Sequence, residues 1–391
     1  PALYSLIAQH RFSKDFYIVG YARSDKTQEE FHKEFEESIR KNYKEKIDDQ
    51  LLKQLSKHVS YFKGQYDKKS DFLSLREYIS NLTGRSSLTT LAYFSVPPTV
   101  FKDIIQNLGE TKNSKLEDLR LIVEKPFGND TNSARELFHF VARYFDEDCV
   151  YLLDHYLGKT AVNSLLNLRP SNRLLNSMMK GPEINNIQIT AFEKIGVTTR
   201  GSYFDQVGTI KDMVQSHLLQ ILALMTMSIP ITENAESLHR EKYSILSALK
   251  FTESKNNIVL GQYESYHNEK DIPKSSQTET FAALRLFIDR ESWYKTPIYI
   301  RTGKKLNKKH TYVVVELKKF AFQPKNEEPN RLIFELQPEE KINIRLINRA
   351  GLAEHGREIT TSHSIACSGD DCLPEHGLLL LDGIRKRRVN F

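Results

Sequence analysis

The chain has 391 residues, more than one ordinary hydrophobic core holds, so two domains are expected. Its 39% hydrophobic and 27% charged residues are typical of a globular protein and exclude a disordered one. The net charge of +6 suits an anionic small molecule, and no long basic run or basic–aromatic stripe favours nucleic acid as a partner. No stretch approaches about 20 uninterrupted apolar residues and no secretion signal is visible, so neither a membrane span nor export is expected.

The three cysteines, Cys149, Cys367 and Cys372, are few and odd in number, which is typical of a reducing compartment and favours the cytoplasm. Cys367 and Cys372 are close enough in sequence to approach each other. They have no His or Cys companions that would complete a metal site, so no metal is expected. The basic cluster at residues 385–388 is interpreted as a solvated end of the chain.

The first half of the chain alternates strand-like and helix-like segments. Residues 27–42 predict an exposed helix, because Phe31 and Phe35 fall on one face among charges. Thr99 is placed to cap a helix after Pro97-Pro98. Short apolar runs predict strands at residues 16–21, 88–96, 119–123 and 150–153. Helices between such strands indicate a parallel, doubly wound α/β sheet, so residues 1–154 are predicted to form a Rossmann-like dinucleotide-binding domain.

The second half follows a different pattern. A helix is expected near residues 155–168, a strand at 187–193 and a long helix around 208–228. Closely spaced strands are then expected at residues 258–263, 282–288, 297–301, 312–317, 331–336 and 341–347. Alternation of apolar and polar residues, as in KINIRLIN, indicates antiparallel strands with one buried face. Residues 155–391 are therefore predicted to form an α+β domain with a large antiparallel sheet.

His217 lies within a mostly apolar helical segment, QSHLLQIL. It is either a core histidine with a satisfied hydrogen bond or a general base oriented by a carboxylate. Asp154, at a strand end that enters a helix, could supply that carboxylate or could cap the helix. The two roles of Asp154 are compatible, because a carboxylate has two oxygens.

His155 and Lys159 stand four residues apart, so on a helix they would share a face. In the first helical turn they would add charge to free backbone N–H groups and form a phosphate site. Tyr156 could add a hydroxyl donor. The alternative interpretation is a solvated basic face.

Other polar residues follow predicted strands. Lys125, in EKPFG, comes at a strand end that would point into the ligand crevice of an open α/β sheet. The run at residues 301–309, RTGKKLNKK, concentrates cations or is merely a solvated turn. Glu193 and Asp212 could accept hydrogen bonds from sugar hydroxyls. Arg23 ends the strand FYIVGYAR, where an arginine accommodates the 2′-phosphate of NADP, although Asp25 lies two residues away.

These segments together resemble the glucose-6-phosphate dehydrogenase family, in the same order and with the family's spacing. The blocks are IVGYARS at 18–24, VPPTVF at 96–101, EKPFG at 124–128, DHYLGK at 154–159, RGSYFD at 200–205, QSHLLQIL at 215–222, NNIVLGQY at 256–263, YIRTGKKLNKK at 299–309 and LQP at 336–338. LPEHGLLLLD at 373–382 is a looser match. The resemblance implies oxidation of D-glucose 6-phosphate at C1 to 6-phospho-D-glucono-1,5-lactone with hydride transfer to NADP, the first step of the oxidative pentose phosphate pathway. It also implies a homodimer or homotetramer associating through the sheet domain.

The resemblance also implies roles for individual residues. His217 would take the proton of the C1 hydroxyl, and Asp154 would orient it. The substrate phosphate would be held by His155, Tyr156 and Lys159. Further substrate contacts are implied for Lys125, Glu193, Asp212, Lys304, Lys309 and Gln337. Coenzyme contacts are implied for Arg23, Tyr93 and Lys125, with Lys125 between substrate and nicotinamide.

The chain departs from the family pattern at several places. The family opens with a strand and a Gly-rich turn of the type GxxGDLA, whereas this sequence begins just downstream, at Pro1. We expect that residues are omitted from the sequence or that the molecule is truncated and binds NADP poorly. The sequence also stops soon after LLLLD. Lys309 replaces a common arginine, which keeps the charge but loses the planar fork. Glu335 stands where animal members have an arginine for a second, structural NADP, so that extra site is not expected.

Two other classes of protein remain open. One is a catalytically silent, truncated relative that binds sugar phosphate without coenzyme. The other is a phosphate-binding regulatory module, which would explain the basic residues but gives no reason for His217 and Asp154 to meet. The leading hypothesis is an active NADP-dependent sugar-phosphate dehydrogenase.

Overall fold

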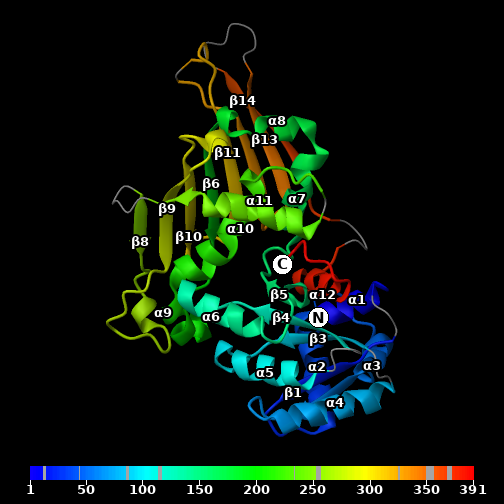
Figure 1. Cartoon of the computed structure of the whole chain (residues 1–391). Coiled ribbons are helices and arrows are strands. Elements are labelled where there is room, and N and C mark those ends of the chain that lie inside the picture. Colours follow the sequence, from blue (N-terminus) through cyan, green and yellow to red (C-terminus); the bar gives the residue numbers. More distant parts are fainter. Residues whose placement is uncertain are drawn as a thin grey trace. The chain divides into compact units, whose positions relative to one another are not determined.

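The structure, a computed structural model, describes residues 1–11, 15–43, 45–84, 88–112, 117–232, 234–251, 257–324, 326–348, 356–367 and 372–391. Two compact units make up the chain (Figure 1): Pro1–Gly158 together with Gly369–Phe391, and Lys159–Ser368. The predicted division between residues 154 and 155 differs from these units at two points. The first unit continues to Gly158, and it includes a C-terminal segment that the prediction assigned to the second domain.

The first unit is a parallel α/β structure. β1 (Ile18–Ala22) pairs in parallel with β2 (Val59–Lys63). A three-stranded parallel sheet has the order β3 (Leu88–Phe94), β4 (Glu117–Glu124) and β5 (Val150–Leu153). Its helices are α1 (Ala2–Ala8), α2 (Gln28–Asn42), α3 (Asp49–Ser56), α4 (Lys69–Thr83), α5 (Phe101–Thr111), α6 (Thr131–Val141) and α12 (Glu375–Ile384). The four strands predicted in this half and their parallel direction are confirmed, and β2 was not predicted.

Side-chain caps explain where two of these helices begin. Thr27 accepts from the Glu30 N–H at the start of α2, and Glu30 bonds back to the Thr27 N–H in a capping box. Asp130 and Ser133 form the corresponding pair at α6. The predicted cap at Thr99 is wrong. A 3₁₀ turn occupies Pro98–Val100, so α5 starts only at Phe101 without a side-chain cap.

The C-terminal helix α12 completes the core of the first unit. Leu379 is fully buried in one cluster with Ile122 of β4 and Tyr151 of β5. Arg120, also buried, donates from Nη1 to the carbonyl oxygens of Gly383 and Ile384, each at 2.7 Å. These bonds give the carbonyls at the end of the helix a buried side-chain donor.

The basic cluster at residues 385–388 is not a loose solvated end. Lys386 lies 3.3 Å from Asp148, and Arg388 lies 3.8 Å from Glu147. Both acids lie in the short turn before β5, so the cluster ties the end of α12 to the sheet of the first unit.

The second unit is built on a nine-stranded sheet with the order β14-β13-β12-β11-β6-β10-β9-β7, and with β8 also paired to β9. β6 and β10 are parallel, and every other pair described in this sheet is antiparallel. The strands are β6 (Ile184–Phe192), β7 (Leu249–Lys250), β8 (Ile258–Gly261), β9 (Phe281–Ile288), β10 (Ile298–Gly303), β11 (His310–Leu317), β12 (Arg331–Gln337), β13 (Lys341–Asn348) and β14 (Arg357–Ser364). Burial alternates along β9, β10, β11 and β12, as expected for a sheet with one buried face.

The helices of the second unit correct two predictions. The helix expected near residues 155–168 begins only at Thr160, because residues 155–158 form a turn. The long helix expected around residues 208–228 is present over Ile210–Thr226, but its first part, Ile210–Leu218, is π-helical rather than α-helical and is followed by α10 (Leu219–Thr226). The non-helical conformation of Gly208 separates it from the preceding α9 (Gly201–Thr209). The unit also contains α7 (Thr160–Ser171), α8 (Arg173–Met178) and α11 (Ala235–Ser247).

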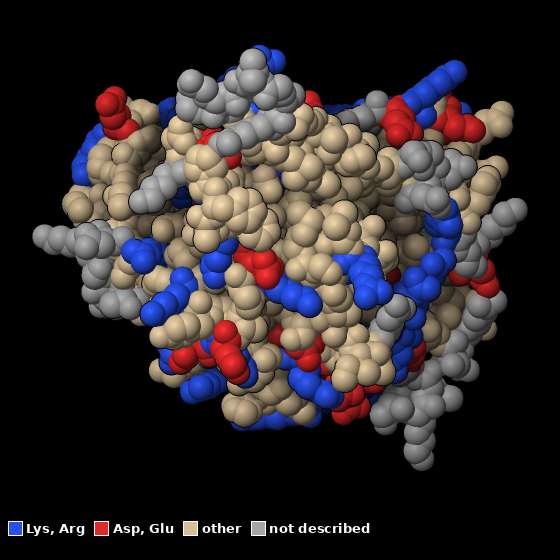
Figure 2. Space-filling model, turned by 90° about the horizontal axis from the view of Figure 1, so that it is seen from above, with Lys and Arg blue, Asp and Glu red and all other residues tan. Residues whose placement is uncertain are grey.

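The structure also bears on two expectations from composition: the absence of a membrane span and the reduced state of the cysteines. Among the described residues, no helix is both long and apolar enough to span a bilayer. On the face seen in Figure 2, Lys and Arg are interspersed with Asp and Glu, with broad uncharged areas between them. Cys367 and Cys372 are disulfide-bonded, which differs from the reduced thiols expected, whereas Cys149 is a free thiol whose pKa is raised by burial.

Candidate active site

In the first unit, candidate residues gather at the carboxyl ends of the parallel strands. Lys125 follows β4 and Asp154 follows β5, and these strands pair through Glu124 and Leu153. Tyr93, near the end of β3, donates a hydrogen bond to Glu124. Burial, and then this contact, raise the pKa of Tyr93, so its hydroxyl stays protonated at neutral pH. This edge is where open α/β sheets bind ligands, so the predicted placement of these side chains is supported.

Asp154 caps a turn. Its Oδ1 accepts from the Tyr156 N–H at 2.9 Å, and its carbonyl oxygen accepts from the Leu157 N–H at 3.0 Å. The capping role proposed for Asp154 is therefore present, although the capped element is a turn. One oxygen of the carboxylate thus accepts a backbone hydrogen bond within the turn.

The same turn arranges His155 and Tyr156. The His155 ring stacks on His376 of α12 at 6.4 Å between centroids, and it meets Tyr156 edge-on at 5.2 Å. His155 is not in the first turn of a helix, so the predicted helical face shared with Lys159 is wrong. Gly158, at the end of the turn, packs closely against α12: a Cβ there would lie 2.5 Å from the Glu375 carbonyl oxygen, so only glycine fits.

Arg23 lies just after β1 and is exposed. Its guanidinium stacks over the Tyr66 ring at 5.2 Å. The competing acid, Asp25, lies 3.0 Å from Lys63 of β2. That ion pair offsets the carboxylate that would repel a phosphate, so the strand end presents a net cation.

In the second unit, the parallel pairing of β6 and β10 creates the centre of the candidate site. Gly303 pairs with Phe192, so the residues that follow, Lys304 and Glu193, emerge side by side. Lys304 Nζ lies 2.5 Å from Glu193 Oε2 and 3.5 Å from Asp212 Oδ2. Both Lys304 and Asp212 are almost fully buried, with 11% and 7% of their side chains exposed. The run RTGKKLNKK is therefore more than a solvated turn, because its first lysine is held inside an acidic cluster.

His217 and Asp212 share the π-helical segment Ile210–Leu218, and both are buried, with 1% and 6% exposure. Widened helical turns of this kind are rare and are frequently found at functional sites. The negative charge of Asp212 also contributes, after burial, to a raised pKa of Tyr203. A buried imidazole and a buried carboxylate on one short segment are the components of acid–base chemistry on a polar substrate.

Two further residues lie at the same edge of the large sheet. Lys159, the N-cap residue of α7, reaches Gln337 at the end of β12, with 3.4 Å between Lys159 Nζ and Gln337 Oε1. Lys309 precedes β11 and is exposed. Because His310 pairs with Phe192 and Thr311 pairs with Gln337, this start of β11 lies level with the ends of β6 and β12. The edge thus carries cations from separate elements: Lys304 after β10, Lys309 before β11 and Lys159 at the start of α7.

Two residues of this region were not singled out from the sequence. Phe204 of α9 lies under Lys304, with 5.1 Å between Nζ and the ring centroid. Glu279, just before β9, bonds to the start of the π-helical segment at Ile210. Phe204 is part of the block RGSYFD and could have been noticed there, whereas a single glutamate before a strand gives no sequence signal.

A parallel α/β unit with polar strand ends, followed by a unit with a large mostly antiparallel sheet and an acid–base helix, defines a class: an oxidoreductase with a dinucleotide-binding domain. The comparisons identify the family. The description "Glucose-6-phosphate dehydrogenase, NAD binding domain" matches residues 1–164, and "Glucose-6-phosphate dehydrogenase, C-terminal domain" matches residues 166–391.

Individual relatives agree. The glucose-6-phosphate 1-dehydrogenase of Schizosaccharomyces pombe is 36% identical over 365 residues, which are 90% of this chain and 73% of that protein. The same enzyme of Aggregatibacter actinomycetemcomitans is 35% identical over 98% of this chain and 82% of that protein. A solved glucose-6-phosphate dehydrogenase in complex with glucose-6-phosphate matches with a TM-score of 0.90 and 31% identity, covering 100% of this chain and 84% of that one. The chain belongs to the glucose-6-phosphate dehydrogenase family, as the sequence motifs indicated.

Proposed function

We propose that the chain oxidises the C1 hydroxyl of D-glucose 6-phosphate to 6-phospho-D-glucono-1,5-lactone, with NADP as the hydride acceptor and His217 as the base. The buried cluster of Lys304, Glu193 and Asp212, with His217 on the same helical segment as Asp212, carries this proposal. Hydride can leave C1 only as the hydroxyl proton is removed, and an imidazole oriented by a carboxylate does this near neutral pH. Asp154 is the proposed orienting carboxylate.

The sugar hydroxyls are proposed to bind to Glu193 and Asp212. Carboxylates accept hydrogen bonds from hydroxyl groups, and Lys304 fixes both of them in place by its contacts at 2.5 and 3.5 Å. Lys304 and Gln337 would themselves bond to the sugar, and Lys309 would close the pocket. Several bonds from rigid strand ends hold C1 in one orientation, which is the main requirement for hydride transfer.

The substrate phosphate is proposed to bind to His155, Tyr156 and Lys159. Lys159 stands at the N-terminus of α7, where backbone N–H groups and the helix dipole add to its charge. The phosphate takes no part in the chemistry, but its binding energy positions the rest of the sugar.

NADP is proposed to bind at the carboxyl ends of the parallel strands. Arg23 would hold the 2′-phosphate, Tyr93 would face the coenzyme, and Lys125 would lie between coenzyme and sugar. The nicotinamide supplies the electron acceptor, and the protein supplies placement and electrostatics. The family match establishes a dinucleotide-binding domain, and the choice of NADP over NAD depends on Arg23 and on the Asp25–Lys63 ion pair.

Two substitutions test the base. His217→Asn should reduce kcat by several orders of magnitude while glucose 6-phosphate still binds in a calorimetric titration. Asp154→Asn should reduce kcat with a smaller effect on binding, because the amide no longer favours the reactive tautomer of the imidazole. Near-normal turnover of His217→Asn refutes the assignment of the base.

The alternative from another class is a silent relative that binds sugar phosphate without coenzyme. Titrating the 391-residue polypeptide with NADP, followed by fluorescence or calorimetry, separates the two. Saturable binding that weakens on Arg23→Ala supports the dehydrogenase, and no binding at millimolar NADP leaves the alternative.

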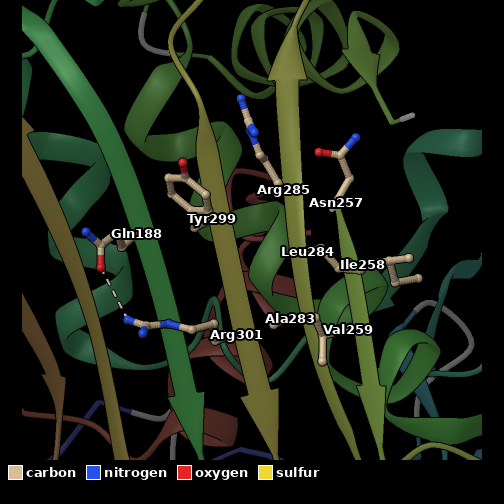
Figure 3. A pocket seen from close by; sticks show the side chains of 9 residues that line it. All are labelled: Gln188, Asn257, Ile258, Val259, Ala283, Leu284, Arg285, Tyr299 and Arg301. Atoms are coloured by element: carbon tan, nitrogen blue, oxygen red, sulfur yellow. Dashed lines mark hydrogen bonds between the residues drawn. The ribbon is translucent and has the colours of Figure 1, made fainter. Parts of the chain in front are cut away.

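We also propose that the chain forms a homodimer or homotetramer through the open face of its large sheet. A hollow of about 350 Å³ lies there across β8, β9, β10 and β6 (Figure 3). Arg285 of β9, Tyr299 of β10 and Asn257, just before β8, line the hollow, and Arg301 turns to Gln188, its Nη2 lying 3.3 Å from Gln188 Oε1.

Apolar side chains accompany these polar ones. Val259 of β8 lines the hollow and is 58% exposed, and its pairing partner Ala283 of β9 lies beside it. Arginine and tyrosine around exposed aliphatic groups are the composition of protein interfaces. Sedimentation of the full chain at micromolar concentration should give a dimer or tetramer, and Val259→Glu should shift it towards the monomer. A wild-type chain that sediments as a monomer overturns the proposal.

The cytoplasm is the proposed compartment, on the strength of the low cysteine content. The disulfide between Cys367 and Cys372 is the observation against it. Fractionation of cells with thiol labelling of the recovered protein decides the point: unlabelled Cys367 and Cys372 in native protein would exclude a reducing compartment.

A further inference from the structure

The helix that carries the candidate base is interrupted by Gly208, which has φ 69° and ψ 171°. This conformation leaves the next N–H groups without helical acceptors. Glu279 provides both replacements. The Thr209 N–H donates to the Glu279 carbonyl oxygen at 3.1 Å, and the Ile210 N–H donates to Glu279 Oε1 at 3.0 Å. A single residue from outside the helix therefore caps the segment Ile210–Leu218.

The break and the cap fit each other closely. A Cβ at position 208 would lie 2.5 Å from Glu279 Oε1 and 2.7 Å from Oε2, so no side chain can stand there while the carboxylate keeps its place. The positive φ of Gly208 independently requires glycine. The close approach of the Glu279 carboxylate to the backbone thus depends both on Glu279 and on the glycine at position 208.

The residue next to Glu279 holds the other part of the site. The Lys304 N–H donates to the Thr280 carbonyl oxygen at 2.9 Å, and the Thr280 N–H donates to the Gly261 carbonyl oxygen at 2.9 Å. Thr280 is 1% exposed. Glu279 and Thr280 therefore connect the start of the segment that carries Asp212 and His217 with the strand end that carries Lys304.

We propose that Glu279 is a positioning residue for catalysis: by capping the π-helical segment it sets the places of Asp212 and His217 relative to Lys304. The proposal rests on the function proposed above. The 3.5 Å between Lys304 Nζ and Asp212 Oδ2 is the distance that the cap controls. Displacement of a reacting group by about 1 Å costs up to about a hundredfold in rate, so loss of the cap should act on turnover.

A helix cap that only stabilises the fold should affect thermal stability but not turnover. The chain offers such a cap as a matched control. Asn234 caps α11 in the same unit, with its Oδ1 accepting from the Ser237 N–H at 2.8 Å. α11 carries none of the proposed site residues. Asn234→Ala therefore removes a comparable cap without touching the catalytic segment.

The experiment compares Glu279→Ala, Glu279→Gln and Asn234→Ala in the full chain, with kcat, KM and thermal midpoint measured for each. Glu279→Ala should lower kcat about ten- to a hundredfold and change the KM for glucose 6-phosphate less than about threefold. Glu279→Gln keeps an oxygen acceptor for the Ile210 N–H and should restore kcat to within about fivefold of wild type. Asn234→Ala should lower the thermal midpoint but leave kcat within about twofold.

Equal kcat losses for Glu279→Ala and Asn234→Ala would overturn the proposal, and so would a kcat for Glu279→Gln no better than for Glu279→Ala. Hydrogen exchange gives a readout without substrate: exchange in residues 209–218 should accelerate in Glu279→Ala and not in Asn234→Ala. If Glu279→Ala does not fold, Glu279→Asp and Glu279→Gln are compared instead. The shorter aspartate should reach the Ile210 N–H less well, so the proposal expects a lower kcat for Glu279→Asp than for Glu279→Gln. His217→Asn separates the failure of the proposed function from the failure of the proposed role of Glu279. If His217→Asn is active, His217 is not the base. If His217→Asn is inactive but Glu279→Ala turns over like wild type, only the positioning role of Glu279 is refuted.

Discussion

Replacing Lys304 by methionine tests the charged centre of the second unit. The methionine side chain has a similar length and keeps the packing of the lysine stem, but it removes the charge and the donors. In the native chain Lys304 lies 2.5 Å from Glu193 and 3.5 Å from Asp212, above the Phe204 ring. Lys304→Met therefore leaves two carboxylates close together without the cation between them.

The size of the effect follows from distance and burial. At 3.5 Å and an effective dielectric constant of about 20, the attraction between Lys304 and Asp212 is about 5 kcal/mol. Removing one partner of a buried pair costs about 3–5 kcal/mol, because the remaining charge stays out of water. Glu193 has 36% of its side chain exposed, so solvent screens its pair and its loss adds at most about 1 kcal/mol. We expect Lys304→Met to lower the free energy of unfolding by about 3 kcal/mol.

Urea unfolding at pH 7 measures this change in the relevant unit. Trp293 is the only tryptophan, is 4% exposed, and donates from its indole N–H to the Thr226 carbonyl oxygen at 3.1 Å. Its fluorescence therefore reports on the second unit. Lys250→Met is the matched control, because Lys250 and Asp289 form an exposed pair at 3.7 Å, and it should change stability by less than about 0.5 kcal/mol.

The double variant Lys304→Met/Asp212→Asn separates charge from packing. With neither charge present, most of the lost stability should return, because two neutral groups leave no uncompensated ion. If the double variant is as unstable as the sum of the two single variants, the charge argument fails. It also fails if Lys304→Met unfolds at the wild-type urea concentration.

Three further predictions concern substrate, coenzyme and pH. Lys159→Ala should raise the KM for glucose 6-phosphate at least about tenfold, because a charge-assisted bond to phosphate is lost, and should leave the KM for free glucose unchanged; parallel losses contradict the phosphate role. Arg23→Ala should lower kcat/KM with NADP about ten- to a hundredfold more than with NAD, and equal losses remove its link to the 2′-phosphate. Burial raises the pKa of Asp382, whose carboxylate accepts a hydrogen bond from Asn390. The native chain therefore binds a proton at Asp382 more tightly than the unfolded chain does. The free energy of unfolding accordingly falls as pH rises above about 4 towards the raised native pKa. Asp382→Asn should thus be more stable than wild type in urea at pH 7 and no more stable below pH 4, and equal stability at pH 7 would contradict this.

Much of the fold was readable from the sequence because its cues are local. The buried runs at 119–123 and 150–153 became β4 and β5, and Thr27 capped α2 where the charged face began. Strand ends carry Lys125, Asp154, Glu193 and Lys304, so chain order alone indicated which edges of the sheets would be polar.

Other features depend on contacts that no local pattern reveals. β14 is exposed at every residue, so it has no alternation to detect. The break at Gly208 and the π-helical turns after it gave no signal in the sequence, because an isolated glycine is tolerated within a helical pattern and the surrounding apolar residues also suit one α-helix. The turn at residues 155–158 takes the place of a helical start because α12, more than 200 residues later in the sequence, packs against Gly158. The ion pairs of the basic cluster at residues 385–388 depend on the same helix.

The placement of α12 sets an order of events during synthesis on the ribosome. Arg120 and the carbonyl oxygen of Gly383 are 263 positions apart, so the sheet of the first unit cannot bury Ile122 and Tyr151 until the whole second unit has been translated. The second unit is one continuous stretch and can fold as soon as it emerges. Chains that end at residue 368 and have been released from the ribosome should therefore resist protease in the second unit while the first is still cleaved, which makes this helix the late step of assembly.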